Sequence, residues 1–259
     1  MDPYLRLFDL PKLVTYDGLG NEASISPISQ LALFASEDLQ KLLRQGILNH
    51  NFGLNEESEL PVIGKMFGVL VVSTMAGKLG YISAFSGKLA GSNEHVEFVP
   101  PVFDMLTENS FLNLGMAQLN VINEKVRELK KSSGNQTEAI QLLKSERKAL
   151  SNSLQHQLFD NYIFVNQFGR EKSLNQIFGE ASYKNPPAGA GECAAPKLLQ
   201  YAFRNGLIPI KMAEFWWGQS PKSNYWKHGH YYPSCKEKCK PILGFMLENG
   251  STGSNALSI

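Results

Sequence analysis

The sequence predicts an α/β protein with a small mixed sheet flanked by helices. An antiparallel helical hairpin is expected between the second strand and a later helix. Two apolar runs, residues 65–73 and 79–85, flank a glycine-containing turn and indicate a β-hairpin. Apolar residues then recur at helical spacing from 115 to about 168. Residues 186–239 hold all three cysteines of the chain.

Composition indicates a folded protein with reduced thiols. The chain has 259 residues, is 43% hydrophobic and carries a formal net charge of +1, so any nucleic-acid surface must be local. Three cysteines are too few for a disulfide scaffold. The first residues lack the pattern of a secretory signal, and the longest apolar run, 66–72, is too short to cross a bilayer. We therefore expect a cytoplasmic protein outside the membrane.

Residues 1–110 are expected to form the N-terminal part of the α/β domain, including the β-hairpin. Prolines and glycines interrupt residues 1–30, which predicts extended segments and turns. Leucines recur at helical spacing after Ser36, a residue type that caps helices, so a helix is expected at about 36–45.

Residues 111–170 are expected to form the inserted helical hairpin, with a polar tip near 131–136. Between Met116 and Gln155 there are seven basic residues against four acidic ones. One interpretation is an arm that contacts the RNA backbone; the other is a solvated coiled-coil face. The candidate RNA-binding residues of the hairpin are Lys125, Lys130, Lys131, Lys144, Arg147 and Lys148.

Residues 171–248 are expected to complete the α/β domain, and residues 249–259 to form a linker or tail. A proline is tolerated in a first helical turn, which predicts a helix from about 192 to Asn205 with Gly206 as its left-handed cap. Residues 208–217 are predicted as a strand, and residues 235–247 as a short helix. Trp217 and Tyr231, in and after this strand, are candidates for stacking on RNA bases or for the core.

The three cysteines are the candidate metal ligands. Cys193 lies at one predicted helix start, and Cys235 and Cys239 lie at another; the two starts are expected to converge at the edge of one sheet. A helix N-terminus favours the thiolate that a metal needs, and zinc takes cysteine and histidine ligands, so His228 and His230 are further candidates. The alternative is that the cysteines are small buried hydrophobic residues.

The order β-hairpin, helix with one ligand, strand and helix with a cysteine pair resembles the zinc-dependent nucleobase deaminases. In that family a glutamate two residues after the first ligand carries protons, and P-C-x-x-C supplies the pair. This chain has Ala195 at the glutamate position, and Cys235 and Cys239 are one residue further apart. These departures favour a structural or vestigial zinc site over a working deaminase.

Longer motifs resemble a different family. The stretches GKMFGVLVV, GYISAFSGKLAGSN, FVPPVFD, PPAGAGECAAPKLLQYAFRNGLIPIKMAEFWWG and HGHYYPSCKEKCKPIL are similar to the N-terminal region of a bacterial group of RluA-type RNA pseudouridine synthases. The resemblance covers about residues 65–247. It implies an accessory region that precedes a catalytic domain in cis. The family's catalytic H-R-L-D signature does not occur here, so the catalytic residues are unknown.

Three functional hypotheses follow. The first is an accessory region for recognition of transfer or ribosomal RNA, or for scaffolding, in a pseudouridine synthase. The second is a zinc-dependent, deaminase-like hydrolase of a nucleobase or nucleotide. The third is a protein-interaction module that forms oligomers through the helical hairpin.

Overall fold

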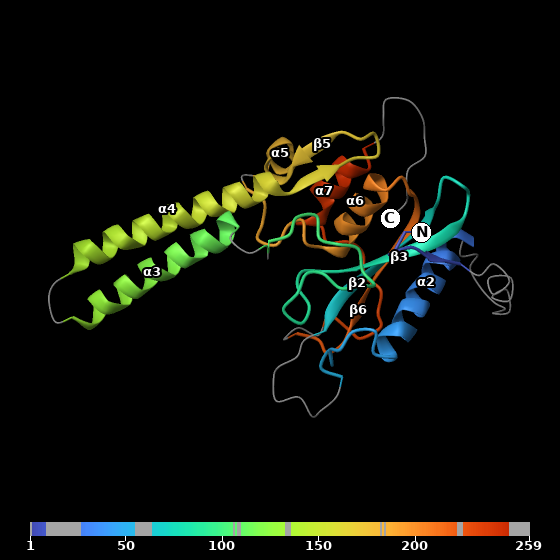
Figure 1. Cartoon of the computed structure of the whole chain (residues 1–259), viewed down its shortest axis with the longest axis horizontal. Coiled ribbons are helices and arrows are strands. Elements are labelled where there is room, and N and C mark those ends of the chain that lie inside the picture. The colour runs from blue at the N-terminus through green and yellow to red at the C-terminus, as the bar shows by residue number, and fades with distance from the viewer. Residues whose placement is uncertain are drawn as a thin grey trace. The chain divides into compact units, whose positions relative to one another are not determined.

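A computed structural model describes residues 2–8, 27–54, 64–105, 107, 110–132, 136–181, 183, 185–221 and 225–248. The chain divides into two compact units (Figure 1). The first, the sheet unit, comprises Met1–Val102, Phe164–Lys172 and Pro187–Ile259, and the second, the hairpin unit, comprises Phe103–Ile163 and Ser173–Pro186, each within the described residues. The hairpin unit therefore includes residues 173–186, which the sequence assigned to the C-terminal part of the α/β domain.

The sheet unit is built on four strands in the order β1-β3-β2-β6. Their bounds are β1 (Arg6–Leu7), β2 (Lys65–Ser73), β3 (Leu79–Phe85) and β6 (Ile208–Trp217). The predicted β-hairpin and the later strand are confirmed, and the α/β class is confirmed with them. Every described pairing in this sheet is antiparallel, whereas a mixed sheet was expected.

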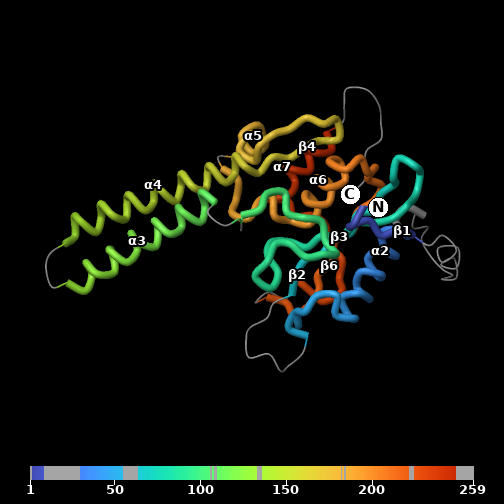
Figure 2. The backbone as a smooth tube through the Cα atoms, in the orientation of Figure 1, coloured from blue at the N-terminus to red at the C-terminus, as the bar shows by residue number. Residues whose placement is uncertain are grey.

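Both faces of this sheet are covered, which explains the continuous apolar run along β2. Helix α2 (Pro27–Arg44) packs on one face, where its Leu39 joins the cluster around Phe67 and Phe215. Helix α6 (Ala194–Arg204) packs on the opposite face, next to Gly68, and α7 (Cys239–Met246) packs on α6 (Figure 2). The unit is thus a sheet between two helical layers.

Two helices of the sheet unit differ from their predicted bounds. Helix α2 begins at Pro27, nine residues before the predicted start, because proline is tolerated in a first turn. Ser36 therefore lies inside the helix, where its buried hydroxyl donates to the Ala32 carbonyl at 2.7 Å instead of capping the start. Helix α7 begins at Cys239 rather than at 235, since residues 236–238 form a turn.

The hairpin unit contains α3 (Phe111–Lys131), α4 (Thr137–Asn161) and α5 (Leu174–Glu180). The Ser110 side chain caps α3 by accepting from the Asn113 N–H at 3.2 Å. Helices α3 and α4 pack along one another, and Gly115 lets the Leu154 side chain approach the α3 backbone. The predicted helical hairpin is confirmed. Part of its tip, residues 133–135, lies outside the described residues.

Several short elements were not predicted. Strands β4 (Ile163–Val165) and β5 (Glu171–Ser173) form a two-stranded sheet, and a capping box of Ser173 and Gln176 starts α5. The β4–β5 segment within the sheet unit, residues 164–172, is hydrogen-bonded to α6. There the Val165 N–H donates to the Gln200 side-chain oxygen at 2.9 Å. The expected linker at 249–259 lies outside the described residues.

Among the described residues, no helix combines the length and the apolar character needed to cross a bilayer.

Candidate metal centre

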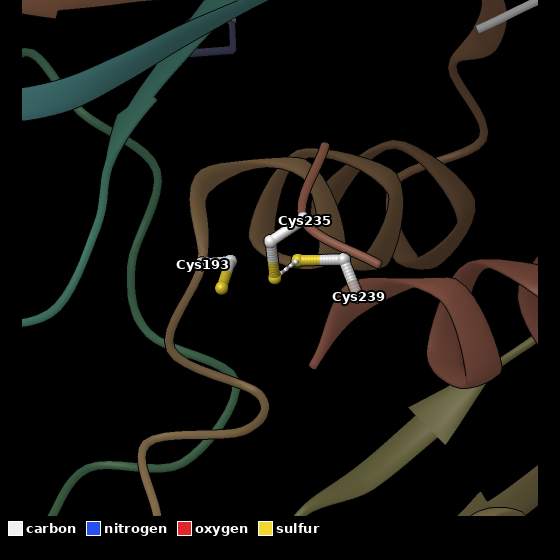
Figure 3. Close-up of side chains that lie close together, drawn as sticks. All are labelled: Cys193, Cys235 and Cys239. Carbon is white, nitrogen blue, oxygen red and sulfur yellow. Dashed lines mark hydrogen bonds between the residues drawn. The ribbon is translucent and has the colours of Figure 1, made fainter. Parts of the chain in front are cut away.

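The three cysteines, distant in sequence, come together in the sheet unit (Figure 3). Cys193 is the N-cap residue of α6, and Cys239 is the first residue of α7. Cys235 lies one turn before Cys239, whose N–H donates to the Cys235 carbonyl at 3.2 Å. The three sulfurs all lie within 4.8 Å of one another, and those of Cys235 and Cys239 are 3.4 Å apart. The predicted convergence of the two helix starts is confirmed.

The local sequence explains why these thiols meet. Cys193 has extended backbone angles, φ −70° and ψ 157°, which suit a residue that precedes the first helical turn. The start of α6 lies close to β2 because Gly68 has no side chain: a Cβ there would lie 3.0 Å from the Ala194 Cβ. Pro241 falls in the first turn of α7, where a proline is tolerated, so the helix begins beside Cys239.

The spacing of the sulfurs suits a metal better than a disulfide. A disulfide needs sulfurs about 2.05 Å apart, and all three cysteines are free. Tetrahedral zinc with bonds of about 2.3 Å places its sulfur ligands about 3.8 Å apart. The observed 3.4 Å and the upper bound of 4.8 Å bracket that value, so small side-chain rotations would complete a three-thiolate site.

The thiols influence one another's protonation. Hydrogen bonding with the other two thiols lowers the pKa of Cys235. Hydrogen bonding with Cys235 raises the pKa of Cys193 to about 12, and contacts with both neighbours, together with burial, raise that of Cys239. One thiolate therefore forms readily, and a bound cation is needed to stabilise the second and third.

A cavity of about 460 Å³ opens onto the three thiols. Its other walls include two acidic side chains and two tryptophans, Trp216 and Trp226, whose stacked rings have centroids 5.3 Å apart. Lys65 and Lys238 add basic groups. The acidic residues are Glu192, next to Cys193, and Glu214, on β6.

Glu214 is a buried carboxylate that the sequence analysis missed. Glu214 is 7% exposed, and burial raises the pKa of its carboxyl to about 7. Hydrogen bonds from the Ser234 hydroxyl and the Ala195 N–H act in the opposite direction. A lone acid in an apolar strand is the only sequence signal, and it does not show which face the side chain occupies.

Lys197, also missed, is 3% exposed on α6. Its Nζ donates to the carbonyls of Phe85 and Gly87, at 3.0 and 3.4 Å, and thereby joins α6 to the segment after β3. Burial lowers the pKa of this amine to about 8. Through these hydrogen bonds, Lys197 holds Gly87, which lines the cavity, close to α6.

The structure does not bring the histidines to the thiols. Within the described ranges, the donor atoms close enough to share a metal come from Cys193, Cys235 and Cys239 alone. The His228 Nδ1 accepts from the Gly218 N–H at 2.9 Å, and its ring packs against Trp217 at 4.2 Å. His228 and His230 are therefore not ligands in this arrangement.

The predicted RNA-binding residues divide into two groups. Trp217 is 2% exposed, so the prediction that it stacks on bases is wrong; its ring belongs to the core between β6 and α2. Tyr231 is 42% exposed and keeps an accessible ring. The six predicted basic residues of the hairpin unit are all exposed: Lys125, Lys130, Lys131, Lys144, Arg147 and Lys148.

Comparison of the chain with protein-family models, with curated proteins and with solved structures finds no match in any of the three.

Proposed function

We propose that this chain is a zinc-binding accessory region of an RluA-type RNA pseudouridine synthase, and that it contacts structured RNA such as transfer or ribosomal RNA. The observation that carries the proposal is the three-sulfur cluster at two helix starts, in a chain without the H-R-L-D signature. The catalytic domain would lie in cis. Reduced thiols at the site suit a cytoplasmic protein.

The zinc part of the proposal depends on the donor set. Cys193, Cys235 and Cys239 would hold the ion, and thiolates select soft or borderline metals such as zinc. When bound, zinc would cross-link the start of α6 to the start of α7 and could leave a fourth position for a water. The site would in that way stabilise the layer of helices that packs on the sheet.

The RNA part depends on the exposed charge of the hairpin unit. Its basic side chains project into solvent. Of the seven basic residues between Met116 and Gln155, only Arg127 makes an ion pair among the described residues, with Glu124 at 2.6 Å. Basic side chains along two helices can follow a phosphate backbone, and Tyr231 of the sheet unit offers a further stacking group.

Binding to transfer RNA at several salt concentrations tests the proposal. We expect affinity to fall steeply with salt, because phosphate contacts release counterions. The chain alone should form no pseudouridine in the same RNA, since the catalytic signature is absent. No RNA binding at low salt, or pseudouridine formation by this chain, would contradict the proposal.

A second candidate, a deaminase-like hydrolase, is favoured by one specific observation. Glu192 and Glu214 line the same cavity as the three thiols, so a carboxylate is available although position 195 is alanine. Bound zinc would supply an activated water, and Glu214 or Glu192 would carry protons. Ammonia release from nucleobases, nucleosides or nucleotides, abolished in E214Q or E192Q, would support this candidate over the first.

The protein-interaction hypothesis has support from exposed apolar side chains in the hairpin unit. Leu142 is 71% exposed, Leu114 56% and Val121 55%. Side chains of this kind would be covered in an oligomer that forms through the hairpin. Light scattering on the whole chain and on an L114S/V121S/L142S variant would reveal an oligomer that depends on these residues.

A further inference from the structure

The Glu214 side chain lines the cavity but is also packed closely by its neighbours. It lies opposite Gly68 in the pairing of β2 with β6, and both residues face the start of α6. A Cβ at position 68 would lie 3.5 Å from the Glu214 Cγ and 3.0 Å from the Ala194 Cβ. The carboxylate is therefore held between the sheet and the helix that begins after Cys193.

The contacts of Glu214 reach both thiol-bearing segments. Its side chain accepts a hydrogen bond from the Ala195 N–H, two residues after Cys193. Its Oε2 also accepts from the hydroxyl of Ser234, which directly precedes Cys235, at 2.6 Å. In addition, its main-chain carbonyl accepts from the Tyr232 N–H at 3.0 Å. One residue thus fixes the α6 start and the segment that leads to α7.

We propose that Glu214 is the positioning residue of the metal centre. By joining the two segments, it sets the separation of Cys193 from Cys235 before any metal binds. This inference rests on the proposed zinc site, and it assigns to Glu214 a role outside the ligand set. Groups that orient metal ligands commonly account for about 10- to 100-fold in metal affinity.

The chemistry of the contacts explains why a polar side chain is needed. Ala195 and Ser234 both donate, and a carboxylate offers two acceptor oxygens. A leucine has no acceptor, so E214L keeps the approximate bulk of the side chain and loses both bonds. A glutamine is the conservative control, because its oxygen can accept from Ala195 while its NH₂ group donates to the Ser234 hydroxyl, which can also accept.

Zinc affinity, measured by competition with a chromophoric chelator on the full chain, tests the inference. We expect E214L to bind zinc about 10- to 100-fold more weakly, with smaller losses in E214Q and S234A. The double variant E214L/S234A should bind no more weakly than E214L, because both changes break the same link. Cobalt(II) provides a second readout: its tetrahedral absorption bands should weaken or shift in E214L.

A destabilised variant on the other face of the sheet provides the control. Val71 is fully buried in the cluster under α2, and V71A should lower stability without changing zinc affinity per folded chain. The inference is overturned if E214L binds zinc within twofold of the natural chain, or if V71A weakens binding equally. If E214L does not fold, S234A provides the test, and an unchanged zinc affinity in S234A overturns the inference.

The two proposals fail in different ways. If the natural chain binds no zinc, the metal centre itself is wrong and this inference falls with it. If the natural chain binds zinc and neither E214L nor S234A changes the affinity, only the role of Glu214 is wrong.

Discussion

Helices α6 and α4 show how differently the two units use a helix. Seven of the 11 residues of α6 are buried, whereas two of the 25 residues of α4 are. Packing on both sides fixes the start of α6, so it can hold a thiol at a defined place. Helix α4 presents most of its side chains to solvent, so it can offer charge but no enclosed site. The sheet unit therefore holds the enclosed thiol cluster, whereas the hairpin unit carries exposed charged side chains.

Loss of a metal ligand should give the largest difference between the effects on zinc binding and on RNA binding. Cys239 is the buried member of the cluster, and all cysteines of the chain belong to it. We expect C239S to weaken zinc binding by at least about 100-fold, since each ligand of a structural site contributes on the order of 3 kcal/mol. RNA affinity of the folded variant should stay unchanged. Chelator competition and filter binding measure the two effects, and parallel losses would contradict the separation.

The pH dependence should also differ between the units. In the metal-free protein the pKa values of Cys193 and Cys239 are raised, so both thiols are protonated at neutral pH. Zinc binding should then release about two protons, and affinity should rise with pH by up to about 100-fold per unit.

Calorimetry in buffers of different ionisation enthalpy counts those protons. RNA binding should change little from pH 6.5 to 8.5, because lysine and arginine remain charged there. Zinc affinity that is independent of pH would show that the thiols do not bind the metal.

Neutralising the hairpin should have the converse effect. K144Q/R147Q/K148Q removes three exposed positive charges from α4. We expect RNA affinity to fall about tenfold at low salt, and the slope of log affinity against log salt to decrease by up to about three. Zinc affinity should not change.

A charge-matched control comes from the sheet unit. K78Q/K88Q/K227Q removes the same charge from exposed positions outside the hairpin. If both triple variants weaken RNA binding equally, the effect is one of net charge, and the hairpin is not the contact surface.

Two glycines give the smallest and most local comparison. A Cβ at Gly68 would lie 3.1 Å from the Leu198 Cδ1, under the start of α6, and one at Gly115 would lie 2.3 Å from a Leu154 methyl. Crowding of this kind costs about 1–3 kcal/mol, and helix propensity offsets about 1 kcal/mol of it in G115A. Thermal unfolding should detect a loss of stability in both G68A and G115A. Only G68A should also weaken zinc binding severalfold.

Long elements with strong patterns were predictable from the sequence. The bounds of β2, β3 and β6 match because each is an apolar run bounded by turn residues. The two-residue strand β1 and the seven-residue helix α5 are too short for a periodicity to develop. The left-handed Gly206, with φ +65°, followed from a local residue preference.

The candidate site was predictable only in part. The convergence of Cys193, Cys235 and Cys239 was predicted from the likeness of the element order to the zinc-dependent deaminases, because two helix starts need not meet. The roles of Glu214 and Trp217 depend on which face of β6 they occupy, and that follows from the register with β2 and the helices on each side. Spacing along the chain contains no such information, so Glu214 was missed, and for Trp217 both stacking on RNA and a place in the core stayed open.

Metal analysis combined with X-ray absorption on the purified chain tests the central claim most directly. The account predicts one zinc per chain, with three sulfur neighbours at about 2.3 Å. A chain that stays free of metal after reduction and incubation with zinc, or zinc bound through nitrogen and oxygen alone, would contradict it.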